Sequence, residues 1–176
     1  MTDPSGVFCN GFPKSGSHAL WRACELLGIP GGVNHSTYAE GEPAGTTHRV
    51  LIVRDPRNII VSWLRFNRMP VTPGTFLAAF RRFQGAPLVE EMAAFEPWLF
   101  VSHVVRFERL LADDTAMRGI ANYCGVDYIA GAWEELPGYT KTYNAEHSDF
   151  RTVWNGDIES AWNGEGGPEL LARWGY

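Results

Sequence analysis

The stretch FCNGFPKSGSHAL, residues 8–20, decides the fold. Its apolar start predicts a short buried strand over residues 6–10. The residues after the last serine of the stretch predict a helix over 17–27, with Gly28 as its stop. Strand and helix are joined by GFPKSG, a loop that contains glycine and proline. We therefore expect a strand, a tight loop and a helix in direct succession.

The loop has the spacing of a phosphate cradle, because Gly11 and Gly16 stand as the two glycines of a nucleotide loop do. The N–H groups at the start of a helix have no partner within the helix, and the helix dipole favours an anion there. Ser15 or Ser17 is the expected N-cap. The alternative is a plain connection rich in turn-forming residues.

The position of the lysine argues against an ATP or GTP loop. A Walker loop has lysine directly after its second glycine, whereas this chain has Ser17 there, followed by His18. Its lysine is Lys14, inside the loop, and no clear acidic strand end is present to hold Mg²⁺. Ser15, Ser17 and His18 add side-chain donors around an anion.

The rest of the chain alternates between strands and helices. Further strands are expected at 32–35, 49–53 and 100–107, and helices at 56–66, 74–83, 87–98, 108–111, 113–123, 129–136 and, with a break at 164–168, 157–174. Strands separated by helices of ten or more residues are typical of a parallel sheet. The sequence predicts an α/β fold: one domain over 1–176, a central, mostly parallel sheet flanked by helices, of the P-loop nucleotide-binding type.

Composition restricts the partners. The chain has 176 residues and a net charge of −5, which argues against a general nucleic-acid binder. Three widely spaced cysteines suggest neither a zinc site nor a disulfide framework. No signal peptide and no apolar run long enough for a membrane span is visible, so we expect a cytoplasmic protein.

A second polar constellation follows the 49–53 strand. Arg54 ends that strand, and Ser62 stands eight residues later on the predicted helix, on the face shared by Asp55 and Asn58. An arginine at a strand end can fork onto a phosphate. An Arg54–Asp55 contact, with the serine bonded to its own backbone, is the alternative. Two anion sites at one sheet edge favour a ligand with separated phosphates.

These motifs resemble those of the sulfotransferases that use 3′-phosphoadenosine-5′-phosphosulfate (PAPS). FPKSGS at 12–17 resembles the family's 5′-phosphosulfate loop, and IVRDPRNIIVS at 52–62 resembles its 3′-phosphate motif. VRFERLL at 105–111 is similar to a family strand end, and HSDFR at 147–151, with the tail RWGY, is similar to the C-terminal segment of bacterial members. The matches occur in family order over nearly the whole chain.

The resemblance implies a role for each matching residue. In the family, the loop lysine, here Lys14, reaches the bridging oxygen of the phosphosulfate, where charge develops as the sulfuryl group leaves. No metal is implied. The implied ligands of the 5′-phosphosulfate are Pro13, Lys14, Ser15, Gly16, Ser17 and His18. Arg54 and Ser62 are implied for the 3′-phosphate and Phe107 for the neighbourhood of the adenine. Because 143–145 lacks the charges of a basic triplet found in many animal members, Thr142 and backbone groups are expected to contribute.

A general base must remove the proton of the attacking acceptor. His35 is our prediction, because many members of the family carry a catalytic histidine in the region between the two nucleotide motifs. Weaker candidates in this chain are His147, Glu40 and Glu42, whereas His18 is assigned to phosphate binding and His48 and His103 to structure.

The sequence thus predicts a PAPS-dependent sulfotransferase. It would move a sulfuryl group to a hydroxyl or amine of a small molecule, glycan or lipid head group, and release 3′-phosphoadenosine-5′-phosphate (PAP). One alternative is a P-loop kinase or other phosphotransferase, which Mg²⁺-dependent ATP turnover would identify. The other is a relative that binds PAPS or PAP without catalysis, since the chain is short and lacks the basic triplet.

Overall fold

A computed structural model describes residues 6–136 and 149–176. The chain divides into two compact units. The first comprises Met1–Arg54 and Pro97–Tyr143, and the second comprises Asp55–Glu96 and Asn144–Tyr176. The boundary between Arg54 and Asp55 falls one residue after the end of the second strand.

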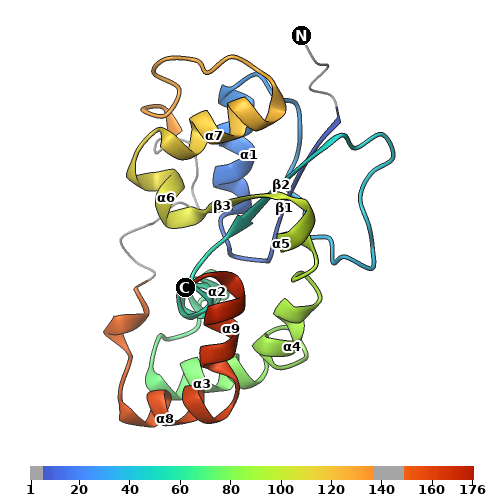
Figure 1. The fold of residues 1–176 in the computed structure, drawn as a ribbon. Coiled ribbons are helices and arrows are strands. Elements are labelled where there is room, and N and C mark those ends of the chain that lie inside the picture. Colours follow the sequence, from blue (N-terminus) through green and yellow to red (C-terminus); the bar gives the residue numbers. More distant parts are fainter. Residues whose placement is uncertain (1–5, 137–148) are drawn as a thin grey trace. The chain divides into compact units, whose positions relative to one another are not determined.

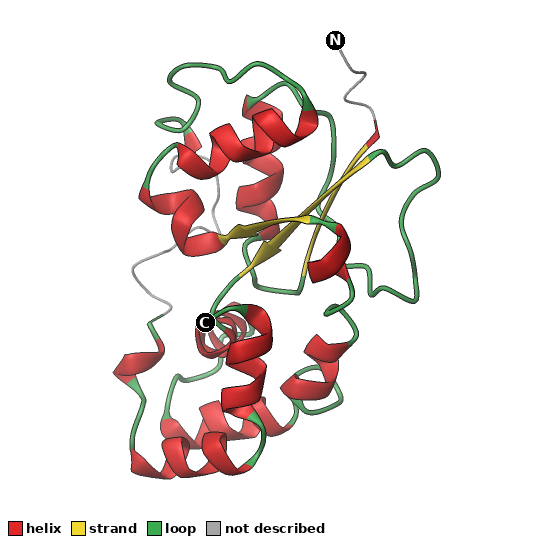
Figure 2. Cartoon of the chain, viewed as in Figure 1, coloured by secondary structure: helices red, strands yellow, loops and turns green. Residues whose placement is uncertain are grey.

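The first unit contains a three-stranded parallel sheet in the order β1-β2-β3 (Figures 1 and 2). Its strands are β1 (Val7–Gly11), β2 (His48–Val53) and β3 (His103–Arg106). Gly11 lies opposite Ile52, so the last residues of β1 and β2 meet at the same edge of the sheet. The predicted α/β class, with a parallel sheet flanked by helices, is confirmed.

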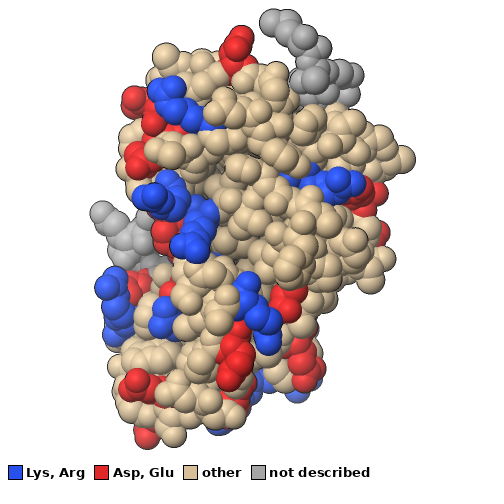
Figure 3. All heavy atoms as spheres, viewed as in Figure 1, with Lys and Arg blue, Asp and Glu red and all other residues tan. Residues whose placement is uncertain are grey.

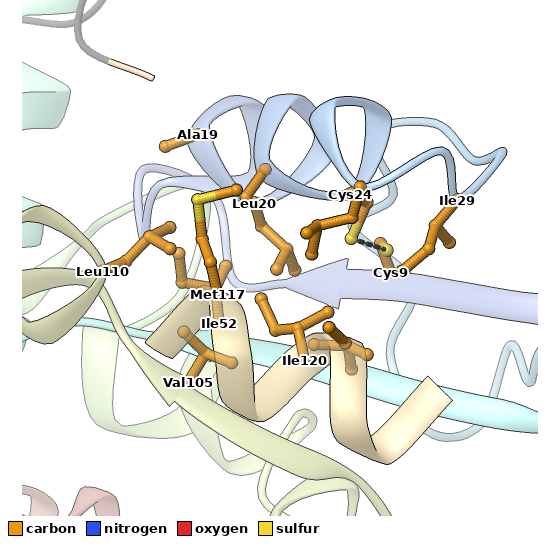
Figure 4. Packing of buried hydrophobic residues seen from close by; sticks show 14 of the residues in the cluster. Cys9, Ala19, Leu20, Cys24, Ile29, Ile52, Val105, Leu110, Met117 and Ile120 are labelled. Atoms are coloured by element: carbon orange, nitrogen blue, oxygen red, sulfur yellow. Dashed lines mark hydrogen bonds between the residues drawn. The ribbon is translucent and has the colours of Figure 1, made fainter. Parts of the chain in front are cut away.

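One face of this sheet carries a continuous core beneath α1 (Ser17–Leu26) and α7 (Thr115–Cys124). Alternate strand residues, such as Cys9, Ile52 and Val105, point into it, as the period of a strand requires (Figure 4). The thiols of Cys9 and Cys24 lie 3.3 Å apart there, and both cysteines are free. The core fixes β1 against α1, and it thereby fixes the two ends of the loop between them.

The first unit also contains α5 (Trp98–Val101) and α6 (Phe107–Ala112). Trp98 packs against Phe8 of β1, with ring centroids 5.4 Å apart. Val7 and Cys9 point into the core on one face of β1, and Phe8, which lies between them, points to the opposite face. The contact with Trp98 therefore covers this second face. Both faces of β1 are therefore packed.

The second unit is helical. It contains α2 (Pro56–Phe66), α3 (Pro73–Arg81), α4 (Leu88–Ala93), the 3₁₀ helix η4 (Phe150–Thr152), α8 (Gly156–Gly164) and α9 (Gly167–Trp174). Aromatic rings connect these elements: Trp154 contacts Phe76, Phe150 and Trp162, and Trp162 also packs on Phe80. The segment after residue 149 therefore packs on the helices near the middle of the chain.

Four predicted elements differ from the structure. The 100–107 strand is wrong at both ends, because β2 pairs only with His103–Arg106 and the flanking residues belong to α5 and α6. The 87–98 helix ends at Ala93, and Pro97 precedes a separate turn of helix. Residues 129–136 form turns in which Gly131 has a φ of 85°. Residues 32–35 form no strand; side-chain hydrogen bonds hold this segment instead.

Candidate functional site

The loop after β1 is a tight turn whose backbone is held from within. Ser15 N–H donates to Phe12 O over 2.9 Å, and both Lys14 (φ 72°) and Gly16 (φ 109°) have left-handed backbone conformations. A residue other than glycine adopts a positive φ rarely, and such residues concentrate at functional sites. The left-handed conformation of Lys14 is therefore consistent with a role for this loop in binding.

The hydroxyls of Ser15 and Ser17 converge on Gly11. A β-carbon on Gly11 would lie 2.7 Å from Ser15 Oγ and 2.9 Å from Ser17 Oγ, so only glycine leaves room for both. Ser15 is fully buried, and its Oγ has no hydrogen-bond partner within the part of the chain that the structure describes. Such an unpaired group costs about 1–3 kcal/mol. A ligand oxygen that bonded this hydroxyl would remove that cost.

The start of α1 has no side-chain cap among the described residues. Its N-cap is Gly16, so the prediction of Ser15 or Ser17 is wrong. The reason is that both hydroxyls turn toward Gly11 instead of toward the helix N–H groups. At the other end, the predicted stop at Gly28 is confirmed, since Gly28 has a φ of 71°. The N-terminal N–H groups of α1 are thus available to an anion.

Three basic side chains gather at this loop. Partial burial lowers the pKa of Lys14. Partial burial also lowers the pKa of His18, and the positive charges of His35 and Lys14 lower it further. His18 is therefore close enough to Lys14 and to His35 to be repelled by each when both members of the pair are charged. A bound anion would relieve this repulsion.

His35 lies beside the loop. Its Nδ1 is 2.7 Å from Gly11 O and 3.4 Å from Ser17 Oγ. A carbonyl oxygen can only accept, so Nδ1 carries the proton and donates it to Gly11 O. The structure therefore brings the predicted base next to the predicted phosphate loop. Of the weaker candidates, Glu42 forms a fork with Arg49, and Glu40 accepts hydrogen bonds from Thr37.

Arg54 joins the loop from the end of β2. It is 6% exposed, and one of its terminal nitrogens donates to Lys14 O over 3.3 Å. Its guanidinium lies 4.4 Å from the centre of the Phe107 ring. A β-carbon on Gly16 would lie 2.3 Å from the same ring, so Gly16 and Phe107 are in close contact. The structure thus brings Arg54 and Phe107 to the loop; adenine binding by Phe107 stays a prediction.

In the second unit, the residues that follow Arg54 are bound to one another. Asp55 caps α2 by accepting from Arg57 N over 2.9 Å, and it also pairs with the Arg57 guanidinium. That guanidinium lies 4.0 Å from the centre of the Phe150 ring, and Asn58 Oδ1 accepts from Phe150 N. Ser62 is half-buried on α2. Its assignment to the 3′-phosphate stays a prediction.

Two predicted residues, Thr142 and His147, lie outside the described residues.

Among residues 6–136 and 149–176, no group of three His, Cys, Asp or Glu side chains is placed to hold a metal ion. The described helices include none with the length and apolar character needed to cross a membrane. On the face drawn in Figure 3, basic and acidic side chains are interspersed.

Sequence reasoning missed the polar groups that hold the His35 segment. They are Asn10, Asn34 and Trp98, which all bond to backbone carbonyls in the first unit. One feature of the sequence could have indicated the role of Asn10: it is a polar residue in an otherwise apolar strand, directly before the loop. Its partner, 26 residues away, could not be deduced from the sequence.

Comparison with known proteins identifies a solved structure of the same fold. No family model matches the chain, and no curated protein matches it. The crystal structure of mouse sulfotransferase SULT7A1 complexed with PAP matches with a TM-score of 0.70 and 14% sequence identity, over 97% of this chain and 90% of that chain. The chain therefore has the sulfotransferase fold.

Proposed function

We propose that this protein is a PAPS-dependent sulfotransferase. The observation that carries the proposal is the loop after β1, where a buried Ser15 hydroxyl without a described partner, the uncapped start of α1 and the partly buried Lys14 all lie within residues 14–17. The fold match to a sulfotransferase complexed with PAP supports it. The residues fit the group, because the unbonded Ser15 hydroxyl and the uncapped N–H groups of α1 are donors for the oxygens of an anion.

PAPS supplies an activated sulfuryl group on its 5′-phosphate and carries a separate 3′-phosphate. In this proposal Ser15, Ser17, His18 and the first N–H groups of α1 bind the 5′ group, with Pro13 and Gly16 shaping the loop. Lys14 stabilises the negative charge that develops when the sulfuryl group departs. This role needs a cation in a partly desolvated place, which is where Lys14 lies.

Arg54 binds the 3′-phosphate in this proposal. Its guanidinium is already oriented by Lys14 O and by the Phe107 ring, so little conformational entropy is lost when it binds. The sequence resemblance adds Ser62 and Thr142 as further ligands and Phe107 as a neighbour of the adenine.

His35 is the proposed general base. Its Nδ1 proton is bound to Gly11 O, so the neutral ring carries its lone pair on Nε2. Nε2 takes the proton of an acceptor hydroxyl or amine as it attacks. The proposed acceptor is a small molecule, a glycan or a lipid head group. The proposed reaction uses no metal, and the expected location of the protein is the cytoplasm.

Binding and transfer are tested separately. In calorimetry, we expect PAP to bind more tightly than 5′-AMP, which lacks the 3′-phosphate, and Arg54→Ala to abolish this preference. Mass spectrometry then follows sulfate transfer from PAPS to a panel of hydroxyl and amine acceptors, with Lys14→Ala as the inactive control. Tight binding without transfer to any acceptor would identify a binding protein. A preference for ATP–Mg²⁺ would contradict the proposal.

A further inference from the structure

Three successive residues of the His35 segment are bound to three successive residues of β1. Asn34 Nδ2 donates to Cys9 O over 3.0 Å, and His35 Nδ1 donates to Gly11 O over 2.7 Å. Ser36 is bound by the side chain of Asn10. Since β1 is an edge strand paired only with β2 among the described strands, this segment follows its other side.

Asn10 makes two hydrogen bonds to the same residue. Its Nδ2 donates to Ser36 O over 2.8 Å, and its Oδ1 accepts from Ser36 N over 3.1 Å. The carboxamide thus satisfies both backbone groups of Ser36, as a neighbouring strand would. An aspartate could not donate to the carbonyl when ionised, and a leucine could do neither. The two bonds therefore specify asparagine.

Trp98 reinforces the same position. Its Nε1 donates to Ser36 O over 3.0 Å, so this carbonyl accepts from two side chains. Trp98 also packs on Phe8, which lies two residues before Asn10 and on the same face of β1. The segment after His35 is therefore fixed by an aromatic ring and an amide on one strand face.

The environment argues that Asn10 serves more than packing. It is 2% exposed, in a strand whose other residues are Val, Phe, Cys and Gly. Burial of an amide without partners costs free energy, and a buried polar network specifies one arrangement when every member is bonded. Here the arrangement is the one that brings the His35 ring to Gly11 O.

We infer that Asn10 is a positioning residue: its bonds to Ser36 hold His35 against Gly11 O in the tautomer that carries the proton on Nδ1 and the lone pair on Nε2. The catalytic meaning of this tautomer rests on the proposed function. The tautomer itself is a property of the free protein, so it can be measured without a substrate.

The experiment is a long-range ¹H–¹⁵N NMR spectrum of protein labelled at histidine nitrogens, recorded at a pH where the ring is neutral. His35→Gln assigns the His35 signals. In the wild type we expect a protonated Nδ1 and an unprotonated Nε2. In Asn10→Asp and in the milder Asn10→Ser, we expect His35 to lose this signature and to exchange between both tautomers. Asn122→Ala, at an exposed position of α7, should leave it unchanged.

Three results would overturn the inference. The first is a wild-type His35 protonated on Nε2. The second is a folded Asn10 variant, verified by its thermal midpoint, with the wild-type His35 signature. The third is failure of both Asn10 variants to fold, which would make Asn10 a residue of the fold alone. PAP titration of the same wild-type sample is read separately: absence of binding contradicts the proposed function and leaves the tautomer result standing.

Discussion

The two turns that lead from a strand into a helix end differently. At the start of α1 the N-cap is Gly16, no side chain caps the helix within the described residues, and the buried Ser15 hydroxyl has no described partner. At the start of α2, Asp55 caps the helix and also binds the Arg57 guanidinium. Both connections have the same order of strand, turn and helix. The start of α1 is nevertheless available to an anion, whereas the start of α2 is capped by a carboxylate.

A helix start can bind an anion when no acidic side chain caps it. A helix start attracts anions by its N–H groups, but an acidic cap already uses these groups and adds a negative charge. At the second turn, the residue suited to a phosphate is Arg54, which precedes the cap and is oriented by Lys14 O and Phe107. Proposed phosphate ligands thus come from helix N–H groups and the Ser15, Ser17 and His18 side chains at the first turn, and from the Arg54 side chain at the second.

The largest expected effect follows from Gly16→Ala. The new β-carbon would lie 2.3 Å from the Phe107 ring at a φ of 109°, so the loop or the ring must move. We expect loss of PAP binding in calorimetry and a lower thermal midpoint. Gly28→Ala is the matched control, because Gly28 also has a positive φ but its β-carbon meets nothing within 4 Å. It should cost only about 1 kcal/mol of stability and leave PAP binding intact. Equal effects of both variants would contradict the account.

Two variants, one at each helix start, should have opposite effects on stability and on PAP affinity. Ser15→Ala removes a buried hydroxyl without a described partner, so the free energy of unfolding should not fall, whereas PAP affinity should fall about tenfold. Asp55→Ala removes a cap, so stability should fall by about 1 kcal/mol, with PAP affinity retained. Chemical denaturation and calorimetry measure both. If Ser15→Ala lost stability and kept affinity, the two turns would not differ as described.

A smaller effect is expected from the proton on His18. Because its pKa is lowered in the folded protein, the unfolded chain binds this proton more readily, and stability is lost as pH falls through the ordinary histidine range near 6.5. A bound PAP anion should reverse the shift, so binding near pH 7 should take up protons. Calorimetry in buffers of different ionisation enthalpy measures this uptake.

The matched controls for His18 are two glutamine variants. His18→Gln should show less proton uptake on PAP binding and a flatter decline of stability with falling pH. His48→Gln, at the start of β2 and so at the opposite end of the sheet from the loop, should behave as the wild type does. Unchanged uptake in His18→Gln would show that another group takes the proton.

The local parts of the site could be predicted from the sequence, because each is a short pattern of neighbouring residues: the glycines and lysine of the loop at 11–16, and the arginine that ends the 49–53 strand. Contacts between distant segments could not. Trp98 reaches Ser36 across 62 positions, and no local pattern encodes that pairing. The N-cap was mispredicted for a related reason. The hydroxyls of Ser15 and Ser17 can point either toward the N–H groups of the helix or toward Gly11, and the conformation of the whole loop decides which.

The alternation of apolar strands with helices predicted the parallel sheet, but not which residues would pair. The strand predicted over 100–107 includes Phe100, which is 87% exposed in a turn of helix. Apolar character alone does not distinguish a short strand from a helical turn, and here pairing with β2 decided the limits of β3.

Nucleotide binding by the loop after β1 is tested by a calorimetric titration of the wild-type protein and Ser15→Ala with PAP, beside ATP–Mg²⁺. We expect micromolar binding of PAP to the wild type, about tenfold weaker binding to Ser15→Ala, and no preference for ATP–Mg²⁺. Absence of PAP binding, or equal affinity of the two proteins, would show that the loop after β1 does not bind the nucleotide as proposed.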